Sequence, residues 1–322
     1  MTDNMAAHNQ CDNASFTDDE AYTCNRVQEM TFLISYALVG VVMFFGNSFV
    51  CLVFLASKKL RRNFMNIFLL SLSVSDMLMA LLIVPFYTVH CFRDCSHVLT
   101  PYCWLLRKAR DFALTATMLN TCAISYDRYL AILRPLQYGV KMTRLRVGAI
   151  LTFVWLIPVV VAVTRNFWHH SAQGEERRHL TVKLYDVAVV IVPVILFQTV
   201  ILAVNIQIIR KIHQHKKATR KTDVTSCPSE LTRDLKEISR LIKGTTSCVL
   251  VVLTFVISWL PKAVHNFSYV FDSPDSVLSS PLFFRICFLF LFIQSCFNPF
   301  IYTVYRAQFR KTARSVISKW CC

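Results

Sequence analysis

A charged pair, Asp127 and Arg128, closes an apolar run of the sequence and is followed by Tyr129. Ionisable groups in a membrane are costly unless they are paired or hydrated, so charges at the mouth of a membrane helix usually have a function. The pair is the first candidate for a functional site in this chain.

A second ionisable group, Asp76, lies deep in another apolar run, Leu72-Ser73-Val74-Ser75-Asp76. A carboxylate in such a place needs a cation, a proton or a polar cluster to offset its burial. Asp76 is therefore a candidate either for cation binding or for a structural, protonated side chain.

Catalytic chemistry is not favoured by the remaining residues. The pairs His169-His170 and His213-Gln214-His215 have no third ligand at a spacing that suits zinc. The chain has only 6 glycines, and no phosphate-binding glycine loop is found among them. We predict that the protein is not an enzyme.

The elements that carry these residues are long apolar runs. Hydrophobic residues make up 55% of the chain, charged residues 17%, and the mean hydropathy is +0.45. A helix that spans a membrane needs roughly 20 mostly apolar residues. Runs of that length lie near residues 30–55, 65–89, 102–126, 147–164, 184–209, 246–271 and 282–304.

The sequence thus predicts an all-α membrane protein with a seven-transmembrane helix bundle over residues 30–304. An N-terminal tail (1–29) precedes the bundle, and a short amphipathic helix with the C-terminal tail (305–322) follows it. The third internal loop is expected at about 210–243. The first run comes after a polar segment and does not resemble a cleavable signal peptide.

Lysine and arginine lie between alternate runs and after the last run, near residues 58–62, 134–146, 210–243 and 306–319. The positive-inside rule then places the N-terminus outside the cell and the C-terminus in the cytoplasm. The same clusters account for the net charge of +16. Anionic membrane lipid and an acidic intracellular partner are the expected counterparts, and nucleic acid is not.

Single residues at matching places in other runs complete a pattern: Asn47, Trp155, Pro193 and Asn298-Pro299-Phe300-Ile301-Tyr302. With Asp76 and Asp127-Arg128-Tyr129, this pattern resembles the motifs of rhodopsin-like (class A) G protein-coupled receptors over about residues 47–309. Within that family, the chain is most similar to amine-receptor-like orphan receptors.

The resemblance implies a switch at the cytoplasmic ends of the helices. In the family, the arginine at the place of Arg128 is held by its neighbouring carboxylate, here Asp127. On activation it is released and contacts the C-terminal segment of a heterotrimeric G protein. The tyrosine at the place of Tyr302, which follows Asn298 and Pro299, swings inward.

Two departures from the family pattern concern the balance of this switch. Leu241 stands where many receptors have an acidic residue that helps to restrain the arginine. Ile201 stands where a tyrosine usually helps to stabilise the active state. The first change loosens the inactive state, with basal activity as its expected result, and the second weakens the active one.

The resemblance makes Trp259 a toggle at the floor of the ligand pocket. Pro261 removes a backbone hydrogen bond and kinks this helix, which provides a hinge. Phe255 is the expected packing partner of Trp259, near Pro193 and Met118. Aromatic residues at helical spacing usually pack in a hydrophobic core, and the alternative interpretation gives Trp259 and Phe255 only this role.

In the family, the aspartate at the place of Asp76 binds sodium with polar groups of the third and seventh helices. Those positions here hold Thr117, Ser295 and Asn298. The alternative is a protonated, structural Asp76 that is hydrogen-bonded to Asn47 and Asn298. No other cofactor is expected.

The outer ends of the helices carry mixed charge. Arg110 stands where amine receptors have their ammonium counter-ion, and Asp111 is rotated from it by about 100°. Three interpretations remain open: Arg110, Asp111, Asp186 and Lys262 pair with one another; Arg110 and Lys262 hold an anionic or zwitterionic ligand; or Asp186 holds a cation. Two further residues either line the upper pocket or pack: His265 and Asn266.

Modification sites are expected on both sides of the membrane. The resemblance places Cys103 at the position of a disulfide to the second external loop, but that loop, about 165–183, has no cysteine. Its partner is then one of three other cysteines: Cys24, Cys91 or Cys95. Asn13 begins a glycosylation sequon, and Cys321-Cys322 fit palmitoylation, with unmodified thiols as the alternative.

These features together predict a plasma-membrane receptor that converts an extracellular signal into activation of a heterotrimeric G protein. Arrestin, receptor kinases and membrane lipids are further expected partners, and the ligand is not identified by the sequence. One alternative is a weakly signalling or non-signalling seven-helix scaffold of another receptor. A transporter or channel is the other, but the internal repeat typical of transporters is not seen.

Overall fold

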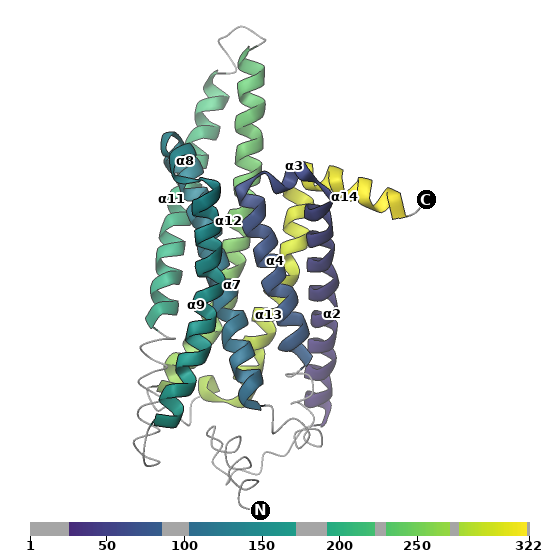
Figure 1. Cartoon of the computed structure of the whole chain (residues 1–322), viewed down its shortest axis with the longest axis vertical. Helices are drawn as coiled ribbons and strands as arrows, with labels where there is room; N and C mark the ends of the chain where they lie inside the picture. The colour runs from purple at the N-terminus through teal and green to yellow at the C-terminus, as the bar shows by residue number, and fades with distance from the viewer. Residues whose placement is uncertain (1–25, 86–102, 172–191, 223–229, 271–276, 321–322) are drawn as a thin grey trace, which may run out of the picture.

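The computed structural model describes residues 26–85, 103–171, 192–222, 230–270 and 277–320. Within these ranges, seven helices of 19 residues or more form one bundle (Figure 1). They are α2 (Arg26–Ala56), α4 (Phe64–Leu82), α7 (Cys103–Leu133), α9 (Arg144–Ser171), α11 (Val192–Thr222), α12 (Glu230–Val270) and α13 (Pro281–Tyr305). The predicted all-helical seven-span bundle is confirmed.

Shorter helices complete one end of the bundle. Figure 1 shows α3 (Lys58–Arg61), α8 (Pro135–Lys141) and α14 (Ala307–Trp320) at the same end, and α3 and α14 are rich in Lys and Arg. Local chemistry starts these elements: Ser57 Oγ accepts the Leu60 N–H at 3.4 Å, and Pro135 occupies the first turn of α8, where no N–H is needed. The one-turn helix η4 (Val277–Ser279) precedes α13.

Helix α7 runs through the middle of the bundle and packs against α4, α9, α11 and α12. By length and composition, six helices among the described residues are apolar enough to cross a membrane, and α7 is not one of them. Its charged residues, Arg110, Asp111, Asp127 and Arg128, explain the difference. Neighbouring helices cover α7 on several sides, so it does not need an apolar surface all round.

The outward faces of the other helices are strongly apolar. Phe45 on α2, Phe153 on α9 and Phe300 on α13 are each at least 60% exposed. Apolar exposure of this extent would be costly in water, and lipid removes that cost. Inside the bundle, Trp155 on α9 donates a hydrogen bond from Nε1 to Ser71 Oγ on α4 at 3.1 Å.

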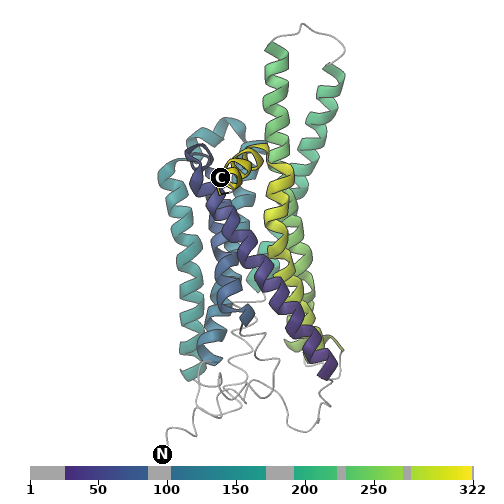
Figure 2. The ribbon, with the colours of Figure 1, turned by 90° about the vertical axis from the view of Figure 1, so that its right-hand side faces the viewer.

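Two glycines show how closely α2 packs against its neighbours. A Cβ atom on Gly40 would lie 2.6 Å from Cγ1 of Val84, which follows α4. A Cβ atom on Gly46 would lie 3.1 Å from Cγ of Pro299 on α13. The backbone of α2 can approach both neighbours only because these side chains are missing. Figure 2 shows α2 inclined across the bundle.

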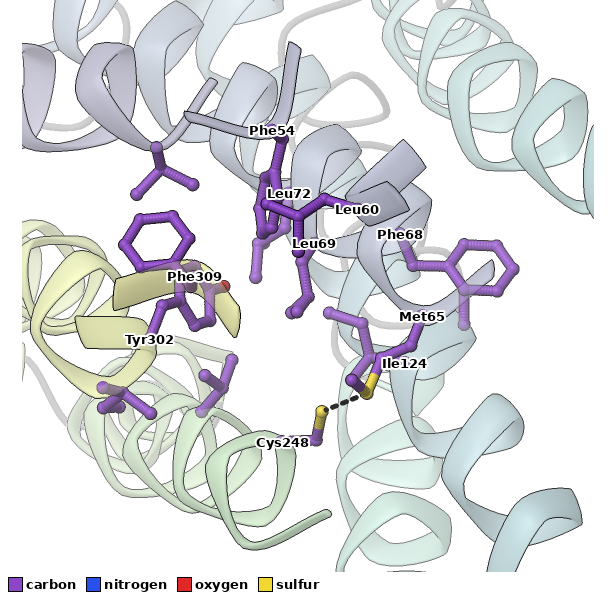
Figure 3. Close-up of a cluster of buried hydrophobic side chains, with 14 of the residues drawn as sticks. Phe54, Leu60, Met65, Phe68, Leu69, Leu72, Ile124, Cys248, Tyr302 and Phe309 are labelled. Atoms are coloured by element: carbon purple, nitrogen blue, oxygen red, sulfur yellow. Dashed lines mark hydrogen bonds between the residues drawn. The ribbon is translucent and has the colours of Figure 1, made fainter. Parts of the chain in front are cut away.

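The apolar core beside α3 contains side chains from seven helices, labelled in Figure 3: α2, α3, α4, α7, α12, α13 and α14. Cys248 on α12 contacts Met65 on α4, with 3.2 Å between the two sulfur atoms. Phe309 on α14 is fully buried and lies edge-on to Phe54, with ring centroids 5.5 Å apart. This contact fixes the point where α14 turns away from α13.

Helices α11 and α12 continue well past their apolar spans, into the region predicted to be the third internal loop (Figure 1). Hydropathy marks the membrane-spanning part of a helix and not its end. The continuing residues are rich in Lys, Arg, Glu and Leu, which favour helix in water as well.

Candidate functional site

The Asp127–Arg128 pair is buried at the end of α7 that lies near α8. Asp127 is 0% and Arg128 5% exposed. Arg128 donates from Nε to Asp127 Oδ2 at 2.8 Å, and its Nη2 donates to the same oxygen. The carboxylate therefore holds the guanidinium in place, as the resemblance implied. Tyr129 is partly buried and packs against the adjacent apolar core.

The other oxygen of Asp127 is bound by a residue from the next helix. Tyr138 on α8 donates its hydroxyl to Asp127 Oδ1 at 3.0 Å. Burial raises the pKa of the Tyr138 phenol, and the negative charge of Asp127 raises it further. The phenol thus remains protonated at physiological pH and keeps donating this bond.

A second arginine enters the same end of the bundle from the junction of α13 and α14. Arg306 donates from Nη2 to Asn66 Oδ1 on α4, and Asn66 donates in turn to the Leu60 carbonyl at 2.8 Å. The side chain of Arg306 is partly buried, and its Nη1 atom is cut off from solvent.

Asp76 lies at the centre of the bundle and is 0% exposed. Ser295 Oγ donates to Asp76 Oδ1 at 2.8 Å, and Asn298 Nδ2 donates to Oδ2 at 2.7 Å. Both donors come from α13, so this cluster joins α4 to α13. The polar cluster that a buried carboxylate requires is present.

Two residues predicted to join this cluster touch it only indirectly. Asn47 donates to the Ser295 carbonyl at 3.3 Å and to the Met43 carbonyl at 3.0 Å, and not to Asp76 as the alternative interpretation had it. Thr117 donates to Ser75 Oγ at 3.4 Å, one residue before Asp76. The reason is geometric: the two α13 side chains already take one carboxylate oxygen each.

The rings of Trp259 and Phe255 contact each other at an interplanar angle of 37°, with centroids 5.3 Å apart. Both are buried in one apolar cluster with Met118 of α7. Pro261 lies inside α12, two residues beyond Trp259. Pro193 lies in the first turn of α11, and its side chain is outside the described residues. The toggle residues of α7 and α12 are thus brought together.

Tyr302 is fully buried near the α14 end of α13. Its ring lies 6.3 Å from those of Phe54 and Phe309, measured between centroids. Its hydroxyl is buried and has no hydrogen-bond partner among the described residues. A buried hydroxyl without a hydrogen bond is costly. Movement of Tyr302 to a polar partner would therefore be favoured by the hydrogen bond that it forms.

The opposite end of α7 carries the predicted ligand-pocket charges. Arg110 and Asp111 form an ion pair, with Nη2 and Oδ1 3.0 Å apart. Lys262 of α12 places its ammonium nitrogen 4.4 Å from the ring centroid of Phe284 and 5.2 Å from that of Phe288. These distances fit cation–π interactions.

His265 of α12 turns toward η4. It is 7% exposed and donates from Nδ1 to the Leu278 carbonyl at 2.8 Å. Its ring lies 5.2 Å from that of Phe284. His265 therefore packs between η4 and α13, whereas Asn266 next to it is partly buried on α12.

The family of 7 transmembrane receptors (rhodopsin family) matches residues 46–302, well over half of this chain. The chain belongs to the rhodopsin family of seven-transmembrane receptors. It is accordingly a multi-pass membrane protein and not an enzyme.

Several rhodopsin-family receptors are similar along most of the chain. Neuromedin-U receptor 2 of Mus musculus is 27% identical over 319 residues, which cover 94% of this chain and 80% of that receptor. The D(1B) dopamine receptor of Xenopus laevis is 29% identical over 318 residues, or 86% of this chain and 68% of that receptor. The histamine H2 receptor of Homo sapiens is 25% identical over 304 residues, or 91% and 80%.

Ile201 stands where receptors of this family usually have a tyrosine, and the structure shows a consequence of this difference. Ile201 is buried on α11 and offers no polar group. One turn further along, Asn205 is also buried and donates to Ser125 Oγ on α7 at 3.3 Å. The polar link between α11 and α7 is therefore made by Asn205.

Tyr138, Arg306 and Asn66 are site residues that sequence reasoning missed. The signal for Tyr138 was its place one turn after Pro135, which begins a helix beside the charged pair. The sequence did not indicate Arg306 or Asn66 as site residues. Arg306 is one of several basic residues near α14, and such residues are usually solvated.

Several predicted site residues fall outside the described residues: Asn13, Cys24, Cys91, Cys95, Asp186, Cys321 and Cys322. The backbones of Cys103 and Leu241 lie in α7 and α12, and their side chains are also outside that part. The glycosylation, disulfide and palmitoylation sites stay predictions.

Proposed function

We propose that this receptor transmits an extracellular signal to a heterotrimeric G protein by releasing Arg128 from Asp127. The observation that carries the proposal is the buried cluster of Asp127, Arg128 and Tyr138. The Asp127 carboxylate holds Arg128 on the same helix and is itself bonded by Tyr138 from α8. Release leaves a buried cation in need of an anion or a hydrogen-bond acceptor. Arrestin and receptor kinases would use the same cytoplasmic end.

The proposed orientation has the N-terminus outside and the C-terminus in the cytoplasm. The placement of α3, α8 and α14 at one end of the bundle supports it (Figure 1), because the positive-inside rule assigns basic loops to the cytoplasm. In that orientation Asn13 is available for glycosylation, and Cys321 and Cys322 for palmitoylation at the inner leaflet.

The test is guanine-nucleotide exchange by purified heterotrimers of each G protein class on membranes that contain the receptor. We expect basal exchange with at least one class, and its loss in Arg128→Ala. Arg61→Ala, which removes an exposed arginine at the same end, is the matched control and should keep the wild-type rate. Absence of exchange with every class would favour the scaffold function instead.

For the ligand, we propose a molecule with an anionic group, either anionic or zwitterionic. The described part of the outer pocket carries the cations Arg110 and Lys262, and the carboxylate of Asp111 is already bonded to Arg110. Lys262→Gln should strongly lower the affinity for an anionic or zwitterionic ligand. Asp186→Asn should instead lower the affinity for a cationic ligand. A screen on both variants separates the two ligand classes.

We further propose that Asp76 binds sodium. The residues present fit a small hard cation, because Asp76 supplies a carboxylate and Ser295 a hydroxyl. The side-chain oxygens of Asn47 and Asn298 are also buried without partners among the described residues. Sodium would supply the positive charge that the buried carboxylate otherwise lacks.

A further inference from the structure

Arg285 is a cation at the edge of the bundle with no anionic partner in the described part of the chain. It lies in the second turn of α13, which begins at Pro281, and its side chain is partly buried. Its guanidinium carbon lies 5.9 Å from the centroid of the Phe32 ring on α2. The ion pairs found among the described residues are those of Arg110 and Arg128. The cation–π contact with Phe32 leaves the N–H donors of Arg285 available for an anion.

The backbone that carries this arginine is held against α2. Tyr36 is fully buried and donates its hydroxyl to the Arg285 carbonyl at 2.8 Å. The Tyr36 ring also packs between two other rings, with centroids 5.9 Å from that of Phe32 and 5.7 Å from that of Phe292. The fold thus fixes Arg285 at the place where α2 and α13 meet.

An apolar seam continues from Arg285 along the contact of α2 with α13, and Figure 2 shows the N-terminal half of α2 passing across α13. On α13 this α2–α13 seam contains Leu289 and Cys296, both partly buried. On α2 it contains Val39, whose carbonyl accepts from the Cys296 thiol at 3.5 Å, and Val42, which is 45% exposed. From Arg285 to Cys296 the seam is roughly 16 Å long, about one leaflet of the ~30 Å hydrocarbon core.

Arg285 also lies close to one edge of the membrane-spanning part of α13. The apolar span of this helix runs from Leu282 to Tyr305, so Arg285 is about 5 Å beyond its first residue. At such a depth the long side chain of an arginine reaches the level of the lipid headgroups. A guanidinium binds phosphate through two parallel hydrogen bonds, so the phosphate of a lipid is an acceptor that suits it well.

We propose that Arg285 and the α2–α13 seam form a binding site for a lipid with an anionic phosphate headgroup. The guanidinium binds the phosphate, and the seam accommodates an acyl chain. In the proposed orientation of the receptor, this lipid belongs to the outer leaflet. A lipid is favoured over a free phosphate ion, because an ion would leave the apolar seam beside the cation uncovered.

The experiment uses full-length receptor in nanodiscs of phosphatidylcholine with two photoreactive lipids. One is a phosphatidylglycerol and the other a phosphatidylcholine, and both carry a diazirine at the end of the same acyl chain. Mass spectrometry of peptides from α2 and α13 measures crosslinking within residues 39–46 and 289–299. The anionic probe should crosslink there at least about fivefold more than the zwitterionic one, because its phosphate is not screened by a choline cation.

Two pairs of variants assign this preference. Arg285→Gln should abolish it, and Arg285→Lys should retain part of it, because lysine keeps the charge without the two parallel hydrogen bonds. Arg314→Gln, which removes an exposed cation of α14, is the control for charge. Leu289→Trp should lower crosslinking by filling the seam. Its control is Phe290→Trp, a change at a residue that is 46% exposed on the same helix.

Thermal unfolding of each variant shows whether it is folded; if Arg285→Gln is not, a reduced preference in Arg285→Lys is the decisive result. Equal crosslinking of the two probes in the wild type would overturn the proposal, because the seam would then accept any lipid. A preference that is unchanged in Arg285→Gln would also overturn it. If glycerol phosphate competes as strongly as unlabelled phosphatidylglycerol, the arginine binds a soluble phosphate and the lipid site is wrong.

Discussion

The hydroxyl of Tyr138 on α8 and the carboxylate of Asp127 on α7 are joined by a hydrogen bond of 3.0 Å. This bond joins the segment between α7 and α9 to the charged pair, because α8 lies in that segment. Movement of α8 therefore changes the environment of the carboxylate that restrains Arg128. A partner that presses on this segment can act on the switch without touching the arginine.

Removal of this hydroxyl should raise basal signalling. A hydrogen bond to a charged group contributes about 1.5–3 kcal/mol, so Tyr138→Phe should increase basal nucleotide exchange roughly three- to tenfold if part of that energy favours the inactive state. Tyr126→Phe, which changes an exposed tyrosine of α7, is the control. Equal basal rates in Tyr138→Phe and wild type would mean that the bond is not a restraint.

An acidic residue at position 241 should lower basal signalling. The resemblance to the family places a second carboxylate there to restrain the arginine, and Leu241 cannot do so. Leu241→Glu should reduce basal exchange, and Leu241→Gln, of similar size but neutral, should not. If both variants behave as the wild type does, the missing carboxylate is unimportant in this receptor.

Sodium should stabilise the folded receptor through Asp76. A ligand at ten times its dissociation constant adds about 1.4 kcal/mol to the free energy of unfolding, which appears as an increase in Tm. We expect the Tm of the wild type to be higher in sodium than in an organic cation at the same concentration. The Tm of Asp76→Asn and of Ser295→Ala should not differ between the two cations. Thr303→Val, an exposed change on α13, should retain the rise. A wild-type Tm that does not depend on sodium would contradict the proposed site.

Gly40→Ala should destabilise the bundle. The new Cβ atom would lie 2.6 Å from Val84 Cγ1, which no real contact allows, and overpacking of this kind typically costs about 1–3 kcal/mol. Gly148→Ala is the matched control, because a Cβ atom there meets nothing within 4 Å. Thermal unfolding of the two variants, and of Gly40→Ala combined with Val84→Ala, measures the effect. The double variant should recover most of the loss.

The sequence predicted the parts of this receptor that depend on local pattern. Apolar runs predicted the seven helices, because burial in lipid requires about 20 apolar residues whatever the neighbours are. The Asp127–Arg128 pair was also foreseeable, since its two members are adjacent in the chain.

Contacts between distant segments were predictable only through the resemblance, or not at all. The bond between Asn298 and Asp76 joins residues 222 positions apart, and family motifs identified both. Arg306 and Asn66 are 240 positions apart and belong to no motif. Tyr138 is only 11 residues from Asp127, but the turn at Pro135 that brings it back is a matter of three-dimensional structure.

The continuation of α12 beyond the membrane has a mechanical consequence. The helix is unbroken from Glu230 to Val270 and contains Pro261. At 1.5 Å per residue, the part between Glu230 and Pro261 is a rod of about 46 Å, so a tilt of about 10° at the proline displaces its far end by roughly 8 Å. A spectroscopic label near Glu230 would therefore report small rearrangements around Trp259 as large changes in distance to a label on α3.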